Sequence, residues 1–220
     1  MYRSNSPQSQ SKYRLTYFDL RGRGEFLRMM LAYAGADWED HRVSVTDWPG
    51  IKPTLLHGVM PVLYEDDKEP LNQMLAVATY LAEKFGLSAC SADERARCLE
   101  ISSWVLMDLA PLTRPCTWYS AKVIEKNDEK AAEALEKIKP KLLSAAKILN
   151  GKLEKNGGQF YVGKKLTWAD FVVGEYVHRL ENSLDGSLLD GCESVRKHGR
   201  RFHELPQLQK YLESRPYAAL

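Results

Sequence analysis

The 220-residue sequence lacks a long apolar run, an excess of charge of one sign and any close grouping of cysteines. No segment is apolar over the roughly 20 residues that a membrane-spanning helix needs, so we expect no membrane anchor. Thirty-one basic residues balance 29 acidic ones, which argues against a nucleic-acid-binding surface. The cysteines are too widely spaced for a zinc ribbon, a CxxC motif or a disulfide framework, and we expect reduced, mostly buried thiols at Cys90, Cys98, Cys116 and Cys192.

The first 12 residues contain no apolar run, so they do not form a secretory signal. Their polar composition predicts a disordered tail, residues 1–12, on a cytoplasmic protein. The chain as a whole is 44% apolar, which is enough for a sizeable core. A basic cluster could bind an anion, but a solvated helix face is the simpler interpretation of Arg196, Lys197, His198, Arg200, Arg201 and His203.

A predicted strand passes directly into a predicted helix within residues 13–28. Alternation places three side chains on one strand face, namely Tyr13, Leu15 and Tyr17. Helical spacing then connects Leu27, Met30, Leu31 and Ala34, and Gly35 ends the pattern. Tyr17 therefore lies at a strand end beside a helix N-terminus, where a phenol could donate to a bound anion. From this segment alone, an ordinary core aromatic is the alternative.

The next segments extend this alternation of strands and helices. Residues 48–54 read as a polar loop, and residues 58–64 as a short strand entered through Met60–Pro61. An acidic turn at Asp66–Asp67 and a helix from about Gln73 to Phe85 follow. The order is β-α-β and then β-β-α, and the small residues at 86–93 end this unit.

The second half of the sequence contains several predicted helices. Ser91 or Asp93 can cap a helix that we expect to continue to Pro111. A long amphipathic helix is predicted from Asp128, with a kink at Pro140 and a stop at residues 156–158. Residues 167–170 have the spacing of a capping box at the start of another helix.

These features resemble the cytosolic glutathione transferases, and the sigma class most closely. The residues that carry the resemblance are 13–28, 48–85, 166–171 and 205–216. The resemblance implies an α/β thioredoxin-like domain at residues 13–86 and an all-α domain at residues 94–220. It also implies a cytoplasmic homodimer without nucleic-acid or membrane partners. The implied reaction is activation of glutathione for attack on a small hydrophobic electrophile, with isomerase or peroxidase side activity.

The same resemblance assigns roles to individual residues. A thiol with a pKa near ~8.5 is mostly protonated at neutral pH, so a transferase must favour the thiolate. Tyr17 would donate a hydrogen bond to the sulfur, and Arg23 would add positive potential. Arg23 could instead pair with a carboxylate such as Glu25 or Asp93.

The other implied contacts bind the rest of glutathione and the second substrate. Trp48 and Lys52 would bind the glycine carboxylate. The cysteinyl backbone would be contacted by Val59, Met60 and a cis Pro61. The γ-glutamyl end would be bound by Gln73 and Met74. Asp108 would reach the ammonium of glutathione across a dimer interface. Leu20, Met107, Pro111 and Trp118 would line the pocket for the electrophile.

The sequence departs from the family pattern at several positions. Met74 stands where the family has serine, so the helix N–H remains but a hydroxyl is lost. The hairpin is one residue longer than in close relatives and holds residues 69–70 in its returning strand. A shifted register of that strand could supply another donor in place of the lost hydroxyl. Val105 and Leu109 replace the acidic residues that bind magnesium in some relatives, and we expect no metal.

Two other functions remain to be weighed. Met74 favours a catalytically weak or inactive protein that binds glutathione or has a structural role, as the lens S-crystallins do. A redox enzyme that uses its own thiol is disfavoured, because no cysteine lies near Tyr17.

Overall fold

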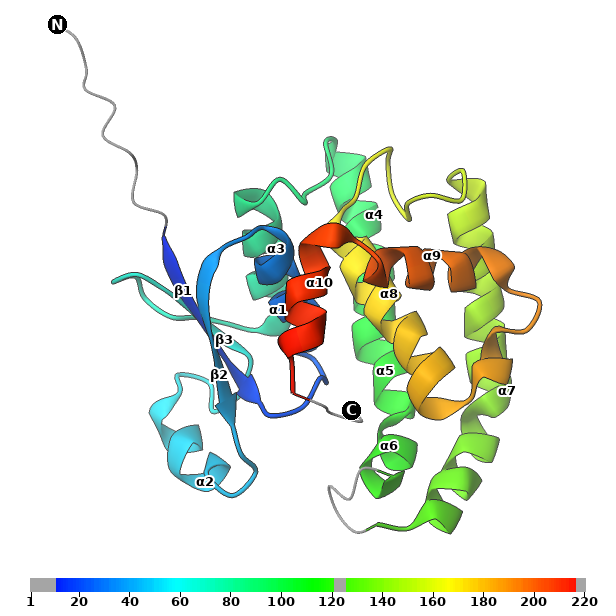
Figure 1. The fold of residues 1–220 in the computed structure, drawn as a ribbon, viewed down its shortest axis with the longest axis horizontal. Coiled ribbons are helices and arrows are strands. Elements are labelled where there is room, and N and C mark those ends of the chain that lie inside the picture. Colours follow the sequence, from blue (N-terminus) through cyan, green and yellow to red (C-terminus); the bar gives the residue numbers. More distant parts are fainter. Residues whose placement is uncertain (1–10, 121–125, 217–220) are drawn as a thin grey trace, which may run out of the picture.

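The computed structural model describes residues 11–120 and 126–216. The expected tail therefore lies outside the described residues, except for its last two positions. Figure 1 shows a sheet-containing unit beside a larger helical unit, with the last helix returning to the first unit. Both the α/β unit and the all-helical unit expected from the sequence are present.

The first unit is built on a mixed four-stranded sheet in the order β2-β1-β3-β4. Its strands are β1 (Lys12–Phe18), β2 (Asp37–Val43), β3 (Val62–Glu65) and β4 (Leu71–Asn72). Strands β1 and β2 are parallel and joined through helix α1 (Glu25–Tyr33), while β3 runs antiparallel to β1 and to β4. β1 begins at Lys12, so the expected tail boundary is one residue too late.

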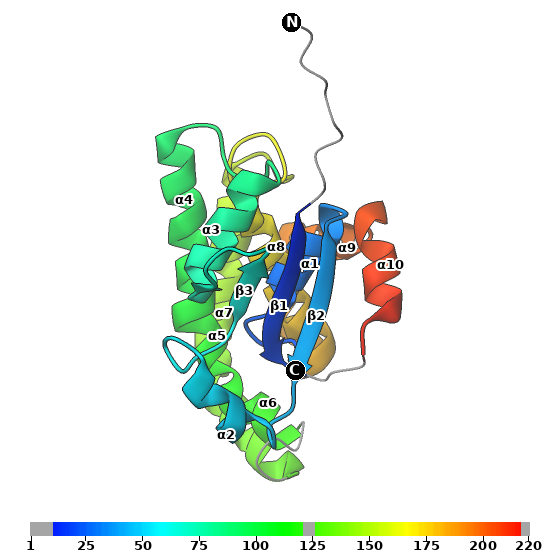
Figure 2. The same ribbon diagram turned by 90° about the vertical axis from the view of Figure 1, so that its left-hand side faces the viewer.

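Helices α1 and α3 (Met74–Lys84) lie between the sheet and the helical unit (Figure 2). Their apolar residues complete the core from one side, since Leu27, Met30 and Leu31 in α1 are fully buried. Helix α8 (Trp168–Arg179) packs against α1 from the other side. The two units therefore share one continuous apolar core.

Within the described residues, the helical unit contains a long path from α4 to α6 and four further α-helices. Its elements are α4 (Ala92–Ser103), a π-helical segment (Trp104–Leu109), α5 (Ala110–Leu112), α6 (Arg114–Ser120), α7 (Asp128–Lys155), α8, a second π-helical segment (Leu180–Leu184), a 3₁₀ turn (Gly186–Leu189), α9 (Glu193–His203) and α10 (Pro206–Ser214). Helix α10 packs on α1, far from it in sequence (Figure 1). None of the described helices is both long and apolar enough to cross a membrane.

Several local predictions are confirmed. Ser91 caps α4 in a capping box with Glu94. Asp170 completes the second capping box by accepting from the Thr167 N–H at 2.9 Å. After α7, two glycines at 157 and 158 have φ of 90° and 77°, which suits only glycine and ends the helix. Three cysteines are buried, and Cys90 is exposed.

Other local predictions were wrong. The expected polar loop at residues 48–54 is helical, with α2 (Trp48–Ile51) followed by a 3₁₀ turn (Lys52–Thr54). Proline in the first turn of each segment explains this, because its fixed φ suits a helix start. Pro111 likewise lies in the first turn of α5 and does not end the helical path. Pro140 lies inside α7. The kink expected there stays a prediction.

The basic cluster on α9 divides between the surface and the core. His198 is buried and its Nε2 lies 3.0 Å from Asp170 Oδ1. Arg196 and Arg200 both approach Glu181, at 3.8 and 2.7 Å. The cluster is therefore not one solvated face.

Candidate active site

Tyr17 lies at the end of β1, with its side chain only 6% exposed. Its hydroxyl oxygen accepts a hydrogen bond from the Arg23 backbone N–H at 3.0 Å. Burial raises the pKa of Tyr17, although the Arg23 N–H and the nearby Arg23 charge act to lower it. The phenol is therefore neutral at pH 7, and its proton is free for another acceptor.

Two glycines in the turn after β1 make room for this phenol. A Cβ on Gly22 would come within 2.8 Å of the Tyr17 hydroxyl oxygen, and its φ of +41° is already unfavourable for other residues. A Cβ on Gly24 would lie 2.4 Å from Tyr17 Cδ1. Contacts this short require the ring to move, so these glycines allow the ring to occupy its observed position.

A buried arginine that the sequence did not reveal holds the same turn. Arg28 is fully buried, and its guanidinium donates to the Phe18 and Leu20 carbonyls at 3.0 and 2.8 Å. It also donates to Asp40 at 2.8 Å and to Glu25 at 3.3 Å. Five donors in a rigid fork allow one arginine to fix both carbonyls and both carboxylates. Only the Glu25–Arg28 spacing, three residues on one helix, was a signal in the sequence.

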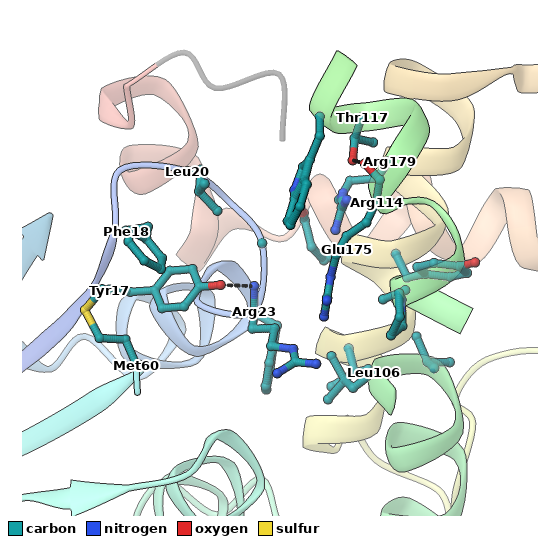
Figure 3. A pocket seen from close by; sticks show the side chains of 18 of the residues that line it. Tyr17, Phe18, Leu20, Arg23, Met60, Leu106, Arg114, Thr117, Glu175 and Arg179 are labelled. Atoms are coloured by element: carbon teal, nitrogen blue, oxygen red, sulfur yellow. Dashed lines mark hydrogen bonds between the residues drawn. The ribbon is translucent and has the colours of Figure 1, made fainter. Parts of the chain in front are cut away.

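A cavity of about 400 Å³ opens between Tyr17 and the helical unit (Figure 3). Its walls come from the β1–α1 turn, the β2–α2 region, the helical path from 105 to 118, and α8. The lining residues are Tyr17, Phe18, Leu20, Gly22, Arg23, Phe26, Val45, Trp48, Met60, Val105, Leu106, Ala110, Pro111, Arg114, Thr117, Trp118, Val172, Glu175, Tyr176 and Arg179.

The cavity brings together only part of the predicted site. Seven of the residues named from the sequence line it: Tyr17, Leu20, Arg23, Trp48, Met60, Pro111 and Trp118. Met107 does not line it, and is 49% exposed. The remaining ones lie outside the lining: Lys52, Val59, Pro61, Gln73, Met74 and Asp108.

Arg23 forms no ion pair among the described residues, so neither proposed carboxylate partner holds it. Glu25 pairs instead with Arg28 and, at 2.6 Å, with Arg215. Asp93 lies 3.9 Å from Arg97. The Arg23 guanidinium is therefore available to the cavity, as Figure 3 shows.

The peptide bond between Met60 and Pro61 is cis, as the resemblance implied. Trp48 packs edge-on against Phe18, with ring centroids 5.2 Å apart. This ring contact connects α2 to the strand end that carries Tyr17.

Helix α3 begins after Gln73, which has φ of 73° and an exposed side chain. No side chain caps this helix, so its first N–H groups have no side-chain acceptor. Met74 belongs to the apolar core and is 6% exposed. The extra hairpin residues 69–70 lie before β4, and the buried Asn72 amide donates to the Pro70 carbonyl at 3.3 Å.

The positions related to a magnesium site are apolar and buried. Val105 lines the cavity, and Leu109 lies in the core. Within residues 11–120 and 126–216, no group of three or more His, Cys, Asp or Glu side chains could hold a metal ion.

Sequence reasoning missed three charged residues of the cavity, namely Arg114, Glu175 and Arg179. Burial acts to raise the pKa of Glu175, but His203 at 3.4 Å and the charges of Arg21 and Arg215 outweigh it and lower that pKa. Helical spacing puts Glu175 and Arg179 on one face of α8, but does not show which cavity that face meets.

Comparisons with known proteins agree with this geometry. Two family models match the chain: "Glutathione S-transferase, N-terminal domain" over residues 13–83, and "Glutathione S-transferase, C-terminal domain" over residues 116–215. Glutathione S-transferase 1 of Ascaris suum is 36% identical over 205 residues, a match that covers 93% of this chain and 97% of that protein. Hematopoietic prostaglandin D synthase of Gallus gallus is 34% identical over 214 residues, with 94% and 98% covered.

A solved structure has the same fold over nearly the whole chain. It is monomeric Na-GST-3, a glutathione S-transferase from the hookworm Necator americanus. The TM-score is 0.85 and the sequences are 27% identical. The match covers 95% of this chain and 100% of the hookworm chain. The resemblance recognised in the sequence is thereby confirmed, and the chain belongs to the glutathione S-transferase family, whose members use glutathione as a substrate.

Proposed function

We propose that this protein joins the thiol of glutathione to small apolar electrophiles, with Tyr17 as the hydrogen-bond donor to the thiolate. The state of the Tyr17 hydroxyl is the main support for this proposal. Its oxygen accepts a hydrogen bond from the Arg23 backbone N–H, and burial raises the pKa of Tyr17. A neutral phenol keeps a proton to donate, and donation to the ionised sulfur lowers the pKa of the thiol. Arg23, which lines the same cavity, adds positive charge that favours the thiolate.

The rest of glutathione would be held by groups around the cavity mouth. The uncapped first turn of α3 supports binding of the γ-glutamyl carboxylate, because free N–H groups at a helix N-terminus favour an anion. The other groups in the proposal are those implied by the family motif: Trp48, Lys52, Val59, Met60, Pro61, Gln73 and Asp108.

The second substrate would lie among Leu20, Pro111 and Trp118, which line the cavity with Tyr17. Met107, which the family motif also implies, does not line this cavity and is exposed. In conjugation, the sulfur electron pair forms a bond to the electrophilic carbon, the leaving group departs with its bonding pair, and the thiol proton passes to solvent. Isomerisation and peroxide reduction would begin from the same thiolate.

The catalytically silent alternative is not favoured. Met74 removes one hydroxyl donor but leaves the α3 N–H groups in place, so only part of the carboxylate's stabilisation is lost. The arrangement around Tyr17 keeps the catalytic donor.

We also propose a cytoplasmic homodimer. The four unpaired cysteines suit a reducing compartment. Asp108 is exposed, as required of a residue that contacts the partner's ligand across an interface. Since the similar Na-GST-3 is titled monomeric, light scattering of the purified protein at several concentrations is the test.

Retention on immobilised glutathione, followed by conjugation of 1-chloro-2,4-dinitrobenzene, tests the proposed activity. We expect retention that free glutathione reverses, and thioether formation above the uncatalysed rate. Retention without conjugation of any electrophile in a chemically varied panel would restore the silent alternative. Absence of retention and of conjugation would refute the proposal.

A further inference from the structure

Three guanidinium groups meet in the cavity without a carboxylate partner. Arg23, Arg114 and Arg179 all line it, and within the described part of the chain none of them forms an ion pair or a side-chain hydrogen bond. The Nε of Arg179 is buried and has no acceptor. Figure 3 shows Arg114 and Arg179 on the helical wall, across the cavity from Tyr17.

Several arginines elsewhere in the described chain have counter-charges, although Arg21 forms no ion pair there and its Nε is buried without a partner. Arg28 and Arg42 both pair with Asp40, at 2.8 and 2.7 Å, and Arg196 pairs with Asp190 at 3.1 Å. Arg114 is exposed, and Arg23 and Arg179 are partly buried. The buried Arg179 Nε has no acceptor, which costs free energy that a bound anion would recover. The cavity therefore brings together three guanidinium groups that have no carboxylate partner among the described residues.

The single carboxylate in the cavity wall does not neutralise these groups. Glu175 has its closest basic partner in His203, at 3.4 Å, and the charges of Arg21 and Arg215 also act on it. Neither Arg114 nor Arg179 comes within ion-pair distance of Glu175. The charge of Glu175 is thus balanced by His203, Arg21 and Arg215, and not by an ion pair with a cavity arginine.

We propose that this cavity selects apolar electrophiles that carry a carboxylate or sulfonate, and that Arg114 and Arg179 determine this specificity. The inference rests on the proposed transferase function and names its substrate class. A planar guanidinium matches the two oxygens of a carboxylate, and the apolar lining strengthens the interaction by excluding water. An anion held on the helical wall leaves the substrate's apolar end to reach the sulfur beside Tyr17.

Binding of two matched fluorescent probes tests the anion preference without turnover. The sulfonate 8-anilinonaphthalene-1-sulfonate and the neutral N-phenyl-1-naphthylamine share one ring framework. We expect wild-type protein to bind the sulfonate more tightly, with a preference that falls as salt is added. Arg114→Gln and Arg179→Gln should each weaken sulfonate binding by about tenfold, the usual scale for losing a hydrogen bond to a charged group, and leave the neutral probe unaffected.

A matched control removes one arginine outside the cavity. Arg97→Gln loses the same charge at an exposed position whose partners are Asp93 and Glu100. It should keep the wild-type preference between the probes. Arg114→Lys and Arg179→Lys keep the charge and should retain part of the preference, and thermal unfolding checks that every variant is folded.

Conjugation of a second matched pair tests specificity in the reaction. In 4-chloro-3,5-dinitrobenzoate and 4-chloro-3,5-dinitrobenzamide, sulfur forms a bond to the carbon that bears chlorine, and chloride leaves with the bonding electrons. Wild-type protein should show a higher kcat/KM for the benzoate. Loss of either cavity arginine should raise KM for the benzoate with little change in its kcat, and should raise KM for the benzamide much less.

The outcomes separate this inference from the proposed function. Equal kcat/KM for the two compounds, or equal loss for both in the arginine variants, would overturn the anion preference while the transferase stands. If neither compound reacts but the sulfonate preference is present and disappears in the arginine variants, the cavity binds anions and the transferase proposal fails.

Discussion

The backbone N–H of Arg23 donates to the hydroxyl oxygen of Tyr17 at 3.0 Å, so that the turn after β1 orients the phenol and leaves its proton free. The donor comes from the main chain, and the Arg23 side chain remains available to the cavity. One residue thus orients the phenol through its backbone and contributes charge through its guanidinium. Several expected results depend on this pair and its surroundings.

Tyr17→Phe should leave glutathione affinity nearly unchanged and lower kcat by about tenfold to a hundredfold, since the lost hydrogen bond is made to the ionised sulfur. The pKa of bound glutathione thiol should rise toward ~8.5, because nothing then donates to the thiolate. Thiolate absorbance across a pH series measures this change. Unchanged turnover at pH 7 would remove Tyr17 from the mechanism and leave Arg23 as the candidate.

Gly24→Ala should disturb Tyr17 because the new Cβ would lie 2.4 Å from Cδ1 of the ring. We expect a loss of stability of about 1–3 kcal/mol from overpacking, together with lower kcat. Gly151→Ala is the matched control, since a Cβ there meets nothing within 4 Å and α7 favours alanine. Urea unfolding and turnover are measured on both, and wild-type turnover in Gly24→Ala would show that the ring position is not critical.

Lys52→Ala should raise KM for glutathione with little change in kcat, if the lysine binds the glycine carboxylate in ground state and transition state alike. The difference from wild type should shrink in high salt. Titration with γ-glutamylcysteine, which lacks that carboxylate, is the control. Equal affinity of wild-type protein for both ligands would contradict the assignment.

Met74→Ser should tighten glutathione binding by on the order of tenfold, because a hydroxyl at the α3 N-terminus adds a donor for the carboxylate. The structure adds a cost, since Met74 is 6% exposed and its side chain belongs to the core. Truncating a buried methionine typically lowers stability by about 2–5 kcal/mol.

Met74→Ala makes a similar cavity without a hydroxyl and is therefore the control for Met74→Ser. Calorimetric titration should place its affinity near that of wild type. If wild type already binds as tightly as Met74→Ser, another group has replaced the hydroxyl. If neither form binds glutathione, the silent alternative is favoured.

Acid should destabilise the fold partly through Glu65 at the end of β3. Burial acts to raise the pKa of Glu65, but bonds from Lys68, Tyr80 and Lys84 outweigh it and lower the pKa from 4.5 to about 2. A lowered folded-state pKa adds stability above pH 4.5, and this stability is lost as pH falls from 4.5 to about 2.

Urea unfolding at several pH values tests the role of Glu65. Glu65→Gln should be less stable than wild type at pH 7, and the difference should narrow below pH 4.5. Glu69→Gln, an exposed glutamate in the same hairpin, is the control and should follow wild type. A constant difference between Glu65→Gln and wild type at every pH would contradict the ionic explanation.

Much of the fold was predictable because its signals are local. Alternating residues predicted β1, helical spacing predicted α1 and α3, and Thr167 with Asp170 predicted the start of α8. The prediction failed at residues 48–54, where polar composition suggested a loop but early prolines start short helical turns.

The sequence by itself determined the order of strands and helices, the position of Tyr17 at a strand end and the family. These follow from interactions within a few residues and from short motifs. Only the tertiary structure decided that Arg28 is buried, that Met74 faces the core, and that Arg23, Arg114 and Arg179 share one cavity. The reason is physical: the burial of a charge and its partners depend on how distant segments pack, and no local periodicity records that packing.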